Sequence, residues 1–552
     1  MGTASTHSGK QRTISVGILT APQIEFCFGR DYVATGREDK VVIDGVAREE
    51  WYFASGGQVA DSQLLPKNRY HCSGGGDIRQ SIDTQKDSLQ APSSFTLKNV
   101  QIGKGFHWQR YQDQSFPGDL RLIAREGRVI AINVVGIEDY LQCVIASEMS
   151  PSAGMEFLKA HAVISRSWLL AQLDKRDEVR EGYSSVECDT PDELVRWQDR
   201  EDHTCFDFCA DDHCQRYQGI PMAGVSADPG MISKTAKVIE ATWGQVLWYD
   251  GRVCDARFSK CCGGALEEFK YCWENKEVPY LKYARDYESV LPSGERVPDG
   301  LLTAGPTTCE TGGIGAEGSA SAPSARENGR MPADLRREQA ARRWILGNPR
   351  AFCNTRSKRL LGQVLKDYDS ETKDFYRWRV EYSQQELHDI IRERTGDDYG
   401  DILDLIPVER GVSGRICRLK IVGTKKAKII GKELEIRKTL SRSHLYSSAF
   451  VVEKVYCPAS GAERVCEAEH RINNKSDAEQ SFLEAEGRAP AKFILHGAGW
   501  GHGVVLCQIG AAAMGARGYD YRTILAHYYP NSEIKFLYGS PRPHNENNTS
   551  SR

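Results

Sequence analysis

No apolar run in the sequence approaches the ~18 residues that a helix needs to span a bilayer. Residues 1–13 are polar and small, and they lack the charged and apolar segments of a secretory signal. Basic and acidic side chains nearly balance, with a formal net charge of −3, so no strong field favours nucleic acid. We therefore expect a chain without a transmembrane segment and without a nucleic-acid partner.

The sequence also lacks internal repeats and an evident disulfide framework. Its 17 cysteines are an odd number, so at least one thiol stays free if the others pair. Most of them stand alone along the chain. Two dense groups stand apart from the rest: Cys205, Cys209 and Cys214, and then Cys254, Cys261, Cys262 and Cys272. These groups favour a metal site or local bridges over a framework that crosses the whole chain.

Patterns along the chain predict an α+β fold with several lobes. At 552 residues the chain is longer than one typical domain. Residues 303–335 are rich in small and polar residues, which predicts a disordered insertion. Alternating apolar residues predict strands over residues 14–20, 49–53, 94–102, 120–124 and 129–135. The predicted divisions are a disordered tail (1–13), a β-rich N-terminal lobe (14–117), a core with a Cys/His loop (118–302), a disordered linker (303–335), an α+β lobe (336–455), a C-terminal segment that completes the core (456–539) and a tail (540–552).

The stretch from residue 137 to 173 carries the first candidate for chemistry. An apolar segment ends at Ala146, and Ser150 followed by Pro151 is typical of a helix start. Glu148 would then lie between apolar side chains and a helix N-terminus, two surroundings with opposite effects on a carboxyl group. Such a glutamate can act as a general acid and base, although an ordinary solvated glutamate fits the same pattern.

A second candidate is residues 497–503, which read Gly-Ala-Gly-Trp-Gly-His-Gly. Glycine at every second position of an extended segment leaves one face bare, so a ligand or another backbone can approach closely. Trp500 offers a flat surface on which a sugar can stack, and His502 can donate or accept a hydrogen bond near neutral pH. A tight packing seam in a β-rich core is the alternative.

A third candidate lies in a loop that begins at residue 203. His203, Cys209, His213 and Cys214 offer two imidazoles and two thiolates, a set that suits tetrahedral Zn²⁺. Cys205 is a spare ligand, and disulfide pairing of these cysteines is the alternative. Four protein ligands leave no open position, so the ion would be structural rather than catalytic.

These motifs together resemble the signature of the stage II sporulation protein D family (SpoIID/LytB). The resemblance rests on residues 138–141 (EDYL), 146–149 (ASEM), 158–168 (LKAHAVISRSW) and 497–512, with shorter matches at 257–264, 278–281 and 413–415. The sequence departs from the family pattern at several positions: His161 stands for a Gln, Phe258 for a His, Cys262 and Cys507 for Ser, Val505 for Gly, Leu506 for Met and Ile509 for an aromatic residue.

The resemblance implies a multi-lobed SpoIID-like fold with a substrate cleft. Characterised relatives are lytic transglycosylases of peptidoglycan, and Glu148 occupies the position of their catalytic acid/base. Relatives of known structure carry zinc on an arrangement that His203, Cys209, His213 and Cys214 match. The residues expected to orient Glu148 or to bind substrate are Lys159, Arg166, Ser259, Trp500, His502 and Gln508.

We therefore expect a lytic transglycosylase that cleaves the MurNAc–GlcNAc bond of peptidoglycan glycan strands with a single glutamate and leaves 1,6-anhydro ends. A peptidoglycan substrate predicts that the protein is located in the cell envelope, the periplasm or the extracellular space. A cytoplasmic location stays open, because no export signal is visible. A non-catalytic, glycan-binding enhancer of a cell-wall amidase is the alternative, which the changes at Phe258 and Cys507 favour slightly. A zinc hydrolase using His496, His502 and His527 is a weaker third, because no H-E-x-x-H motif is present.

Overall fold

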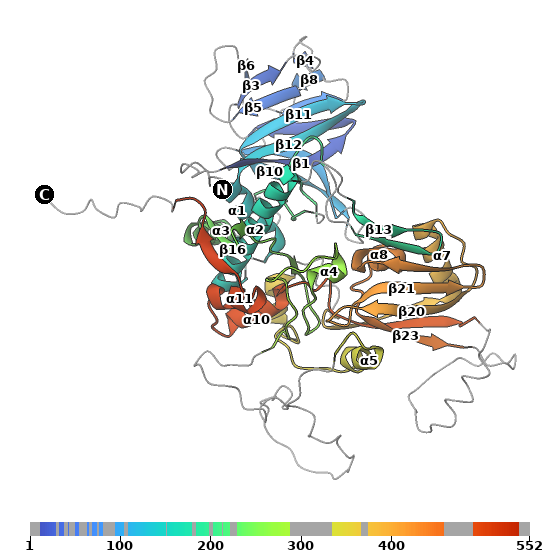
Figure 1. The fold of residues 1–552 in the computed structure, drawn as a ribbon. Helices are drawn as coiled ribbons and strands as arrows, with labels where there is room; N and C mark the ends of the chain where they lie inside the picture. The colour runs from blue at the N-terminus through green and yellow to red at the C-terminus, as the bar shows by residue number, and fades with distance from the viewer. Residues whose placement is uncertain are drawn as a thin grey trace, which may run out of the picture.

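The computed structural model describes residues 12–28, 32–37, 42–43, 50–54, 63–65, 69–73, 77–80, 94–103, 109–150, 152–178, 184–197, 203–211, 214–220, 229–287, 334–365, 374–456 and 489–539. It is a mixed α+β protein, as the sequence predicts. Figure 1 shows an N-terminal β-lobe at the top, a central group of helices below it and a second β-rich lobe at the right. In the part of the chain that it describes, no helix is both long and apolar enough to cross a bilayer. The predicted disordered linker (303–335) and tails (1–13 and 540–552) lie almost entirely outside the described residues.

The N-terminal lobe is built from two sheets that face each other across aromatic side chains. The first sheet has the order β15 (Phe208–Cys209), β1 (Thr13–Ala21), β12 (Arg128–Gly136), β11 (Asp119–Arg125), β5 (Glu50–Ala54), β3 (Tyr32–Arg37) and β6 (Gln63–Leu65). The second has the order β10 (Arg110–Pro117), β9 (Ser94–Ile102), β2 (Gln23–Phe28), β7 (Arg69–Ser73), β8 (Asp77–Gln80) and β4 (Val42–Ile43). Phe26 on one sheet lies 5.8 Å from Phe53 on the other, measured between ring centres, so the two sheets share a core.

The boundary predicted at residue 117 is displaced. Strands β11 and β12 pair with β5 and β1 of the N-terminal sheet, so this lobe extends to Gly136. The predicted strands themselves are confirmed, because each of the five predicted ranges coincides with β1, β5, β9, β11 or β12 to within two residues at either end.

The central helices are α1 (Ile137–Glu148), α2 (Met155–Glu178), α3 (Pro229–Ala241), α10 (Gln508–Ala516) and α11 (Tyr521–Tyr528). α1 begins where β12 ends, with Gly136 as its N-cap residue. Both α10 and α11 pack against α2, although more than 300 residues separate α2 from each of them in the chain. Short strands accompany these helices: β16 (Gln245–Tyr249) between β17 (Arg252–Val253) and β26 (Glu533–Phe536), and β18 (Phe258–Ser259) beside β25 (Leu506–Cys507).

The second lobe combines two sheets with short helices, at the lower right of Figure 1. One sheet has the order β13 (Val186–Asp189), β14 (Glu193–Arg196), β22 (Ala427–Gly431), β21 (Ile416–Gly423) and β20 (Ile402–Arg410). The other places β24 (Lys492–Ala498) between β19 (Arg377–Ser383) and β23 (Phe450–Val455). Helices α5 (Glu338–Leu346), α7 (Gln384–Thr395) and α8 (Glu433–Thr439) pack on these sheets. α4 (Phe269–Cys272) contacts α8, whereas α6 (Lys358–Val364) packs on α10 of the central group.

Candidate functional site

Glu148 is the last residue of α1 and is 9% exposed. Its Oε1 accepts the backbone N–H of Arg216 at 3.1 Å. One residue earlier, the Ser147 hydroxyl donates to the carbonyl of Cys143 and accepts the N–H of Gln218 at 2.9 Å. The segment that follows the Cys/His loop therefore lies along the end of α1 and holds the carboxylate in one orientation.

The helix start predicted at Ser150 and Pro151 is wrong. α2 begins at Met155, and the Ser150 hydroxyl accepts the N–H of Ser152 instead of capping a helix. Pro151 lies outside the described residues. Glu148 therefore stands at the carboxyl end of one helix, and the preceding apolar segment is that helix. The sequence pattern hid α1 because nearly all of its side chains are buried, which removes the polar face that reveals an amphipathic helix.

Arg166 does not reach Glu148, contrary to the prediction. Its guanidinium forms a two-pronged ion pair with Glu138, at 2.8 and 2.5 Å, and donates to the carbonyl of Gln245 at 2.9 Å. Glu138 lies in the first turn of α1, and ten residues of helix at about 1.5 Å each separate it from Glu148 by roughly 15 Å. The Arg166 side chain is fully buried, so it fixes α2 against α1 and presents no surface to a substrate.

Lys159 lies about two turns before Arg166 in α2 and keeps part of its side chain exposed. Its Nζ donates to Glu156 at 2.7 Å and lies 5.7 Å from the centre of the Tyr521 ring at the start of α11. That Lys159 orients Glu148 or a substrate stays a prediction.

The glycine-rich motif is a loop of left-handed residues and not an extended strand throughout. β24 ends at Ala498, and Gly499, Gly501 and Gly503 have φ angles of +76°, +92° and +72°. A Cβ on Gly499 would lie 2.7 Å from the carbonyl oxygen of Cys261. The predicted close approach of another backbone is therefore correct, and the glycines also supply turns that other residues rarely adopt.

Trp500 and His502 project from this loop into aromatic surroundings. The Trp500 ring stacks on Phe375, with ring centres 4.9 Å apart, and meets the edge of Tyr446 at 5.1 Å. One face of the indole is thus covered by protein. The His502 ring meets Trp273 edge to face at 4.9 Å, and its Nδ1 accepts the N–H of Val504. Burial, together with the nearby charges of Arg257 and Arg415, lowers the pKa of His502 well below its usual value. Binding of sugar by either side chain stays a prediction.

Ser259 and Gln508 come close to the same loop through the parallel pair β18 and β25. Ser259 pairs with Cys507, and a Cβ on Gly501 would lie 3.2 Å from the Ser259 Cβ. The Ser259 hydroxyl is buried without a hydrogen-bond partner among the described residues. The Gln508 side chain is 2% exposed. That it lines a substrate groove stays a prediction.

Gln508 instead forms a hydrogen bond to His161 of α2. Its Nε2, a donor only, lies 3.2 Å from the His161 Nε2, which must therefore accept. The other ring nitrogen carries the proton and lies 3.2 Å from the Ser165 hydroxyl. Burial lowers the pKa of His161 to about 3, with a smaller effect from the charge of Lys260. α2 thus connects to the start of α10 through a neutral histidine.

Two buried charged residues that the sequence did not single out hold this region together. The Arg415 guanidinium donates to the carbonyls of Gly501 and Cys262, and a Cβ on Gly503 would lie 2.2 Å from its Cζ. Glu267 accepts the N–H of Val412 and the hydroxyl of Ser413, which in turn accepts from Arg415. The only sequence signal was the short match at residues 413–415, which suggested no role for them.

The predicted zinc ligands come together as far as the structure describes them. The ligand atoms of His203, Cys209 and Cys214 lie within 4.8 Å of one another, and the His203 Nε2 is 3.5 Å from the Cys214 sulfur. His213 lies outside the described residues. The loop is anchored by β15, which pairs with β1, and by Asp207, which accepts from the N–H and hydroxyl of Ser15. This donor set fits a tetrahedral ion.

A second cluster of metal-ligand types was not predicted. Cys262, Asp286, Cys353 and Cys507 place their ligand atoms within 4.8 Å of one another, and all four residues are buried. They come from four separate segments, so no spacing in the sequence could have revealed the group. Its chemistry could hold a metal ion.

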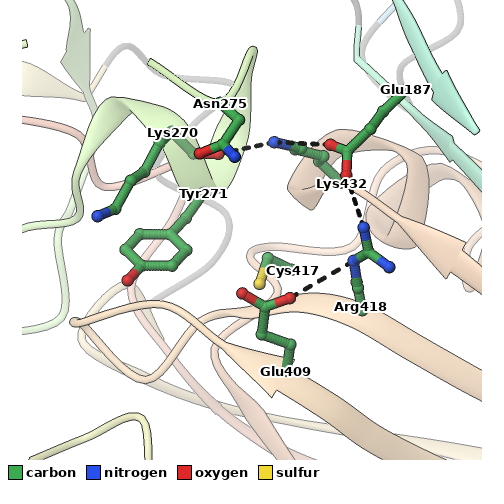
Figure 2. Close-up of a pocket in the computed structure, with 8 residues that line it drawn as sticks. All are labelled: Glu187, Lys270, Tyr271, Asn275, Glu409, Cys417, Arg418 and Lys432. Carbon is green, nitrogen blue, oxygen red and sulfur yellow. Dashed lines mark hydrogen bonds and ion pairs between the residues drawn. The ribbon is translucent and has the colours of Figure 1, made fainter. Parts of the chain in front are cut away.

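A polar cavity of ≈ 250 Å³ lies between α4 and the larger sheet of the second lobe (Figure 2). Its walls are Glu187, Lys270, Tyr271, Asn275, Glu409, Cys417, Arg418 and Lys432. Arg418 is paired with Glu187 and Glu193, while Lys432 donates to the carbonyl of Lys270 and lies 3.3 Å from Glu187. The opposite charges on its walls neutralise one another, and none of the predicted site residues lines it.

Comparison with known families assigns two parts of the chain. Residues 125–249 match the family described as Stage II sporulation protein (SpoIID), and residues 267–465 match a domain of unknown function (DUF8618). A search of curated proteins found no match. The SpoIID match confirms the family resemblance over the part that contains Glu148, and it indicates a role connected with sporulation or the cell wall. The unassigned domain begins at Glu267 and ends before β24.

Proposed function

We propose that the protein is a lytic transglycosylase of peptidoglycan in which Glu148 is the general acid and base. The observation that carries the proposal is the position of Glu148, which lies within the SpoIID match, nine-tenths buried and oriented by the Arg216 N–H. The substrate class and the role of this glutamate come from the family resemblance. The proposed site of action is the cell envelope or the space outside it, where this glycan lies.

The proposed reaction needs a single carboxyl group. Protonated Glu148 donates its proton to the glycosidic oxygen as the bond from that oxygen to the muramic acid C1 breaks. The 6-hydroxyl of the same sugar then attacks C1 and gives its proton to the Glu148 carboxylate, which restores the acid and closes the 1,6-anhydro ring. A second carboxylate and a bound water, which ordinary glycosidases use, are not required. The hydrogen bond from Arg216 would hold one carboxylate oxygen so that the other faces the reacting oxygen.

A zinc ion on His203, Cys209, His213 and Cys214 would have a structural part in this function. The loop that carries these residues leads directly into residues 215–218, which contact the end of α1. The ion would supply a rigid crosslink there, because four protein ligands leave no position for substrate. These residues would thereby fix the segment that orients Glu148.

The test is Glu148→Gln, assayed by digestion of glycan strands with and without stem peptides and mass spectrometry of 1,6-anhydro ends. The amide keeps the size of the side chain but transfers no proton, so we expect release to fall by about 10²–10⁴-fold. Binding to glycan strands should be unchanged. The matched control is Glu386→Gln, the same chemical change on the exposed face of α7. Equal release of 1,6-anhydro ends by the wild type and Glu148→Gln would exclude Glu148 as the catalyst.

A glycan-binding enhancer of a cell-wall amidase is the second candidate. The observation in its favour is Phe258, which stands where the family resemblance places a histidine and packs edge to face on His161 at 5.0 Å. A phenyl ring cannot transfer a proton. If the wild type binds glycan strands both with and without stem peptides and releases 1,6-anhydro ends from neither, this second function replaces the first.

A further inference from the structure

The cluster of Cys262, Asp286, Cys353 and Cys507 joins four segments that are distant in the sequence. Cys262 lies in the turn after β18, and Cys507 ends β25 and is the N-cap residue of α10. Asp286 follows the bridge between Ala265 and Arg285, and Cys353 lies in the loop between α5 and α6. The Cys262 N–H donates to the Cys507 sulfur, and the Cys353 N–H donates to the Asp286 carboxylate, so hydrogen bonds join the four residues in two pairs.

The spacing of the ligand atoms fits one ion with four ligands. A tetrahedral Zn²⁺ has Zn–S distances of about 2.3 Å, which places two sulfur ligands about 3.8 Å apart. The sulfurs of Cys262 and Cys353 are 3.6 Å apart, and all four ligand atoms lie within 4.8 Å of one another. A disulfide has a sulfur–sulfur distance of about 2.0 Å, and it would use only two of the four convergent groups.

The surroundings of the cluster resemble the outer shell of a metal site. Asp286 accepts the hydroxyl of Tyr528 on one carboxylate oxygen at 2.7 Å and the N–H of Cys353 on the other at 3.1 Å. Hydrogen bonds of this kind orient a ligating carboxylate. The Cys507 sulfur accepts the N–H groups of Cys262 and Gly510, at 3.3 and 3.4 Å.

The backbone also compensates for the charge that thiolate ligands would bring. The Cys262 sulfur accepts the N–H of Gly264 at 3.4 Å, so two of the three sulfurs accept backbone N–H groups. Cys507 is the N-cap residue of α10, a helix of nine residues, so the partial positive charge of this helix end lies beside its sulfur. A Cβ on Gly510 would lie 2.7 Å from Asp286, so glycine is needed for the helix to approach this closely.

We propose that Cys262, Cys353, Cys507 and Asp286 bind one structural divalent ion of the zinc type, separate from the ion proposed at His203, Cys209, His213 and Cys214. Soft thiolates with one carboxylate favour Zn²⁺ over Mg²⁺ or Ca²⁺. The burial of all four ligands leaves no open position for substrate. The ion fastens the loop that carries Cys353, within the DUF8618 match, to the turn after β18 and to the start of α10.

The first test counts zinc in the full chain, purified under reducing conditions, by elemental analysis. We expect Cys353→Ser and Asp286→Asn each to carry one Zn²⁺ per chain fewer than the wild type. The control Cys254→Ser changes a buried cysteine outside both clusters and should keep the wild-type zinc content. His203→Ala removes the other proposed ion, so the zinc content of the two sites is counted separately. Each of the two proposed zinc sites can then be refuted without the other.

The second test remains informative if Cys353→Ser does not fold. In the His203→Ala, Cys214→Ser background, the chain is refolded with Co²⁺, whose sulfur-to-metal absorption in the near ultraviolet rises with the number of thiolate ligands. We expect tetrahedral Co²⁺ bound by three thiolates, with absorption about one third lower in Cys262→Ser. Absence of bound Co²⁺ in this background, or a Cys262–Cys353 disulfide in the peptide map of the wild type, would overturn the proposal.

Discussion

At the scale of single residues, buried side chains that carry charge or can take it up decide how this site is held. His161 is the clearest case, because its ring is fully buried between Ser165 and Gln508 and has a pKa of about 3. The unfolded chain would take up a proton on this side chain near pH 6.5. Between these two values the unfolded state binds the additional proton, so stability is lost as the pH falls from about 6.5 toward 3.

The variant His161→Gln should remove this sensitivity to acid. Glutamine can keep a hydrogen bond to Gln508 or Ser165 but does not titrate. We expect the difference in unfolding free energy between wild type and variant to shift by about 1.6 kcal/mol in favour of the variant between pH 6.5 and pH 5. Each pH unit well below 6.5 contributes about 1.4 kcal/mol, and the interval close to 6.5 contributes less. Urea unfolding at the two pH values measures it. A difference that is independent of pH would show that His161 takes up its proton as readily in the folded protein as in the unfolded chain.

A second prediction at this scale concerns the buried pair of Arg166 and Glu138. Removal of one partner leaves an uncompensated buried charge, so Arg166→Met should cost about 3–5 kcal/mol of stability. Arg166→Met with Glu138→Gln should cost much less, since no unpaired charge remains. Denaturant unfolding of both variants tests this. If the double variant is no more stable than Arg166→Met, the pair is not what positions α1 against α2.

At the scale of elements, Gly503 of the glycine-rich loop requires glycine for two reasons, its backbone conformation and the lack of space for a side chain. Gly503 has φ +72°, and a Cβ there would lie 2.2 Å from Arg415. Gly127, in the turn between β11 and β12, has the same φ of +72° with nothing within 4 Å of a Cβ. The two positions therefore share the backbone conformation and differ in the space around them.

This pair gives a matched prediction for alanine substitution. Gly127→Ala should cost about 1–2 kcal/mol, which is the cost of a left-handed conformation alone. Gly503→Ala should cost clearly more, because the new methyl group must also displace the Arg415 guanidinium from the carbonyls that it holds. Thermal unfolding of the two variants compares them directly. Equal losses of stability would mean that Arg415 can move away without cost.

Elements whose signals are local could be predicted from the sequence. The Ser383 cap of α7 and the Asp520 cap of α11 are both present, with hydroxyl or carboxylate accepting the N–H three residues on. Strands β13 and β14 are not evident in the sequence, because they are short and β14 pairs with β22 more than 200 residues away. The same holds for the candidate site. The motif around Glu148 is local and can be recognised in the sequence, whereas the contacts of Arg415 depend on residues from three distant segments.

At the scale of the whole molecule, the last described segment connects the second lobe to the central group of helices. β24 is the central strand between β19 and β23, β25 pairs with β18, and β26 pairs with β16. Helices α10 and α11 pack on α2, within the central group. Residues 489–539 therefore contain the glycine-rich loop and contribute both to the second lobe and to the packing around α2.

From this arrangement we expect the protein to stay folded after the chain is cleaved between β23 and β24. A protease site introduced near residue 470 would, once cleaved, leave two fragments that pair along both edges of β24 and through the buried faces of α10. We expect them to elute together from a sizing column in native buffer and to separate only in denaturant, with an unfolding temperature that rises with protein concentration. The matched variant Leu495→Asp places a charge at a fully buried position of β24 and should weaken the association. If the fragments without Leu495→Asp separate in native buffer, the contacts of β24 and α10 do not suffice to hold the C-terminal fragment.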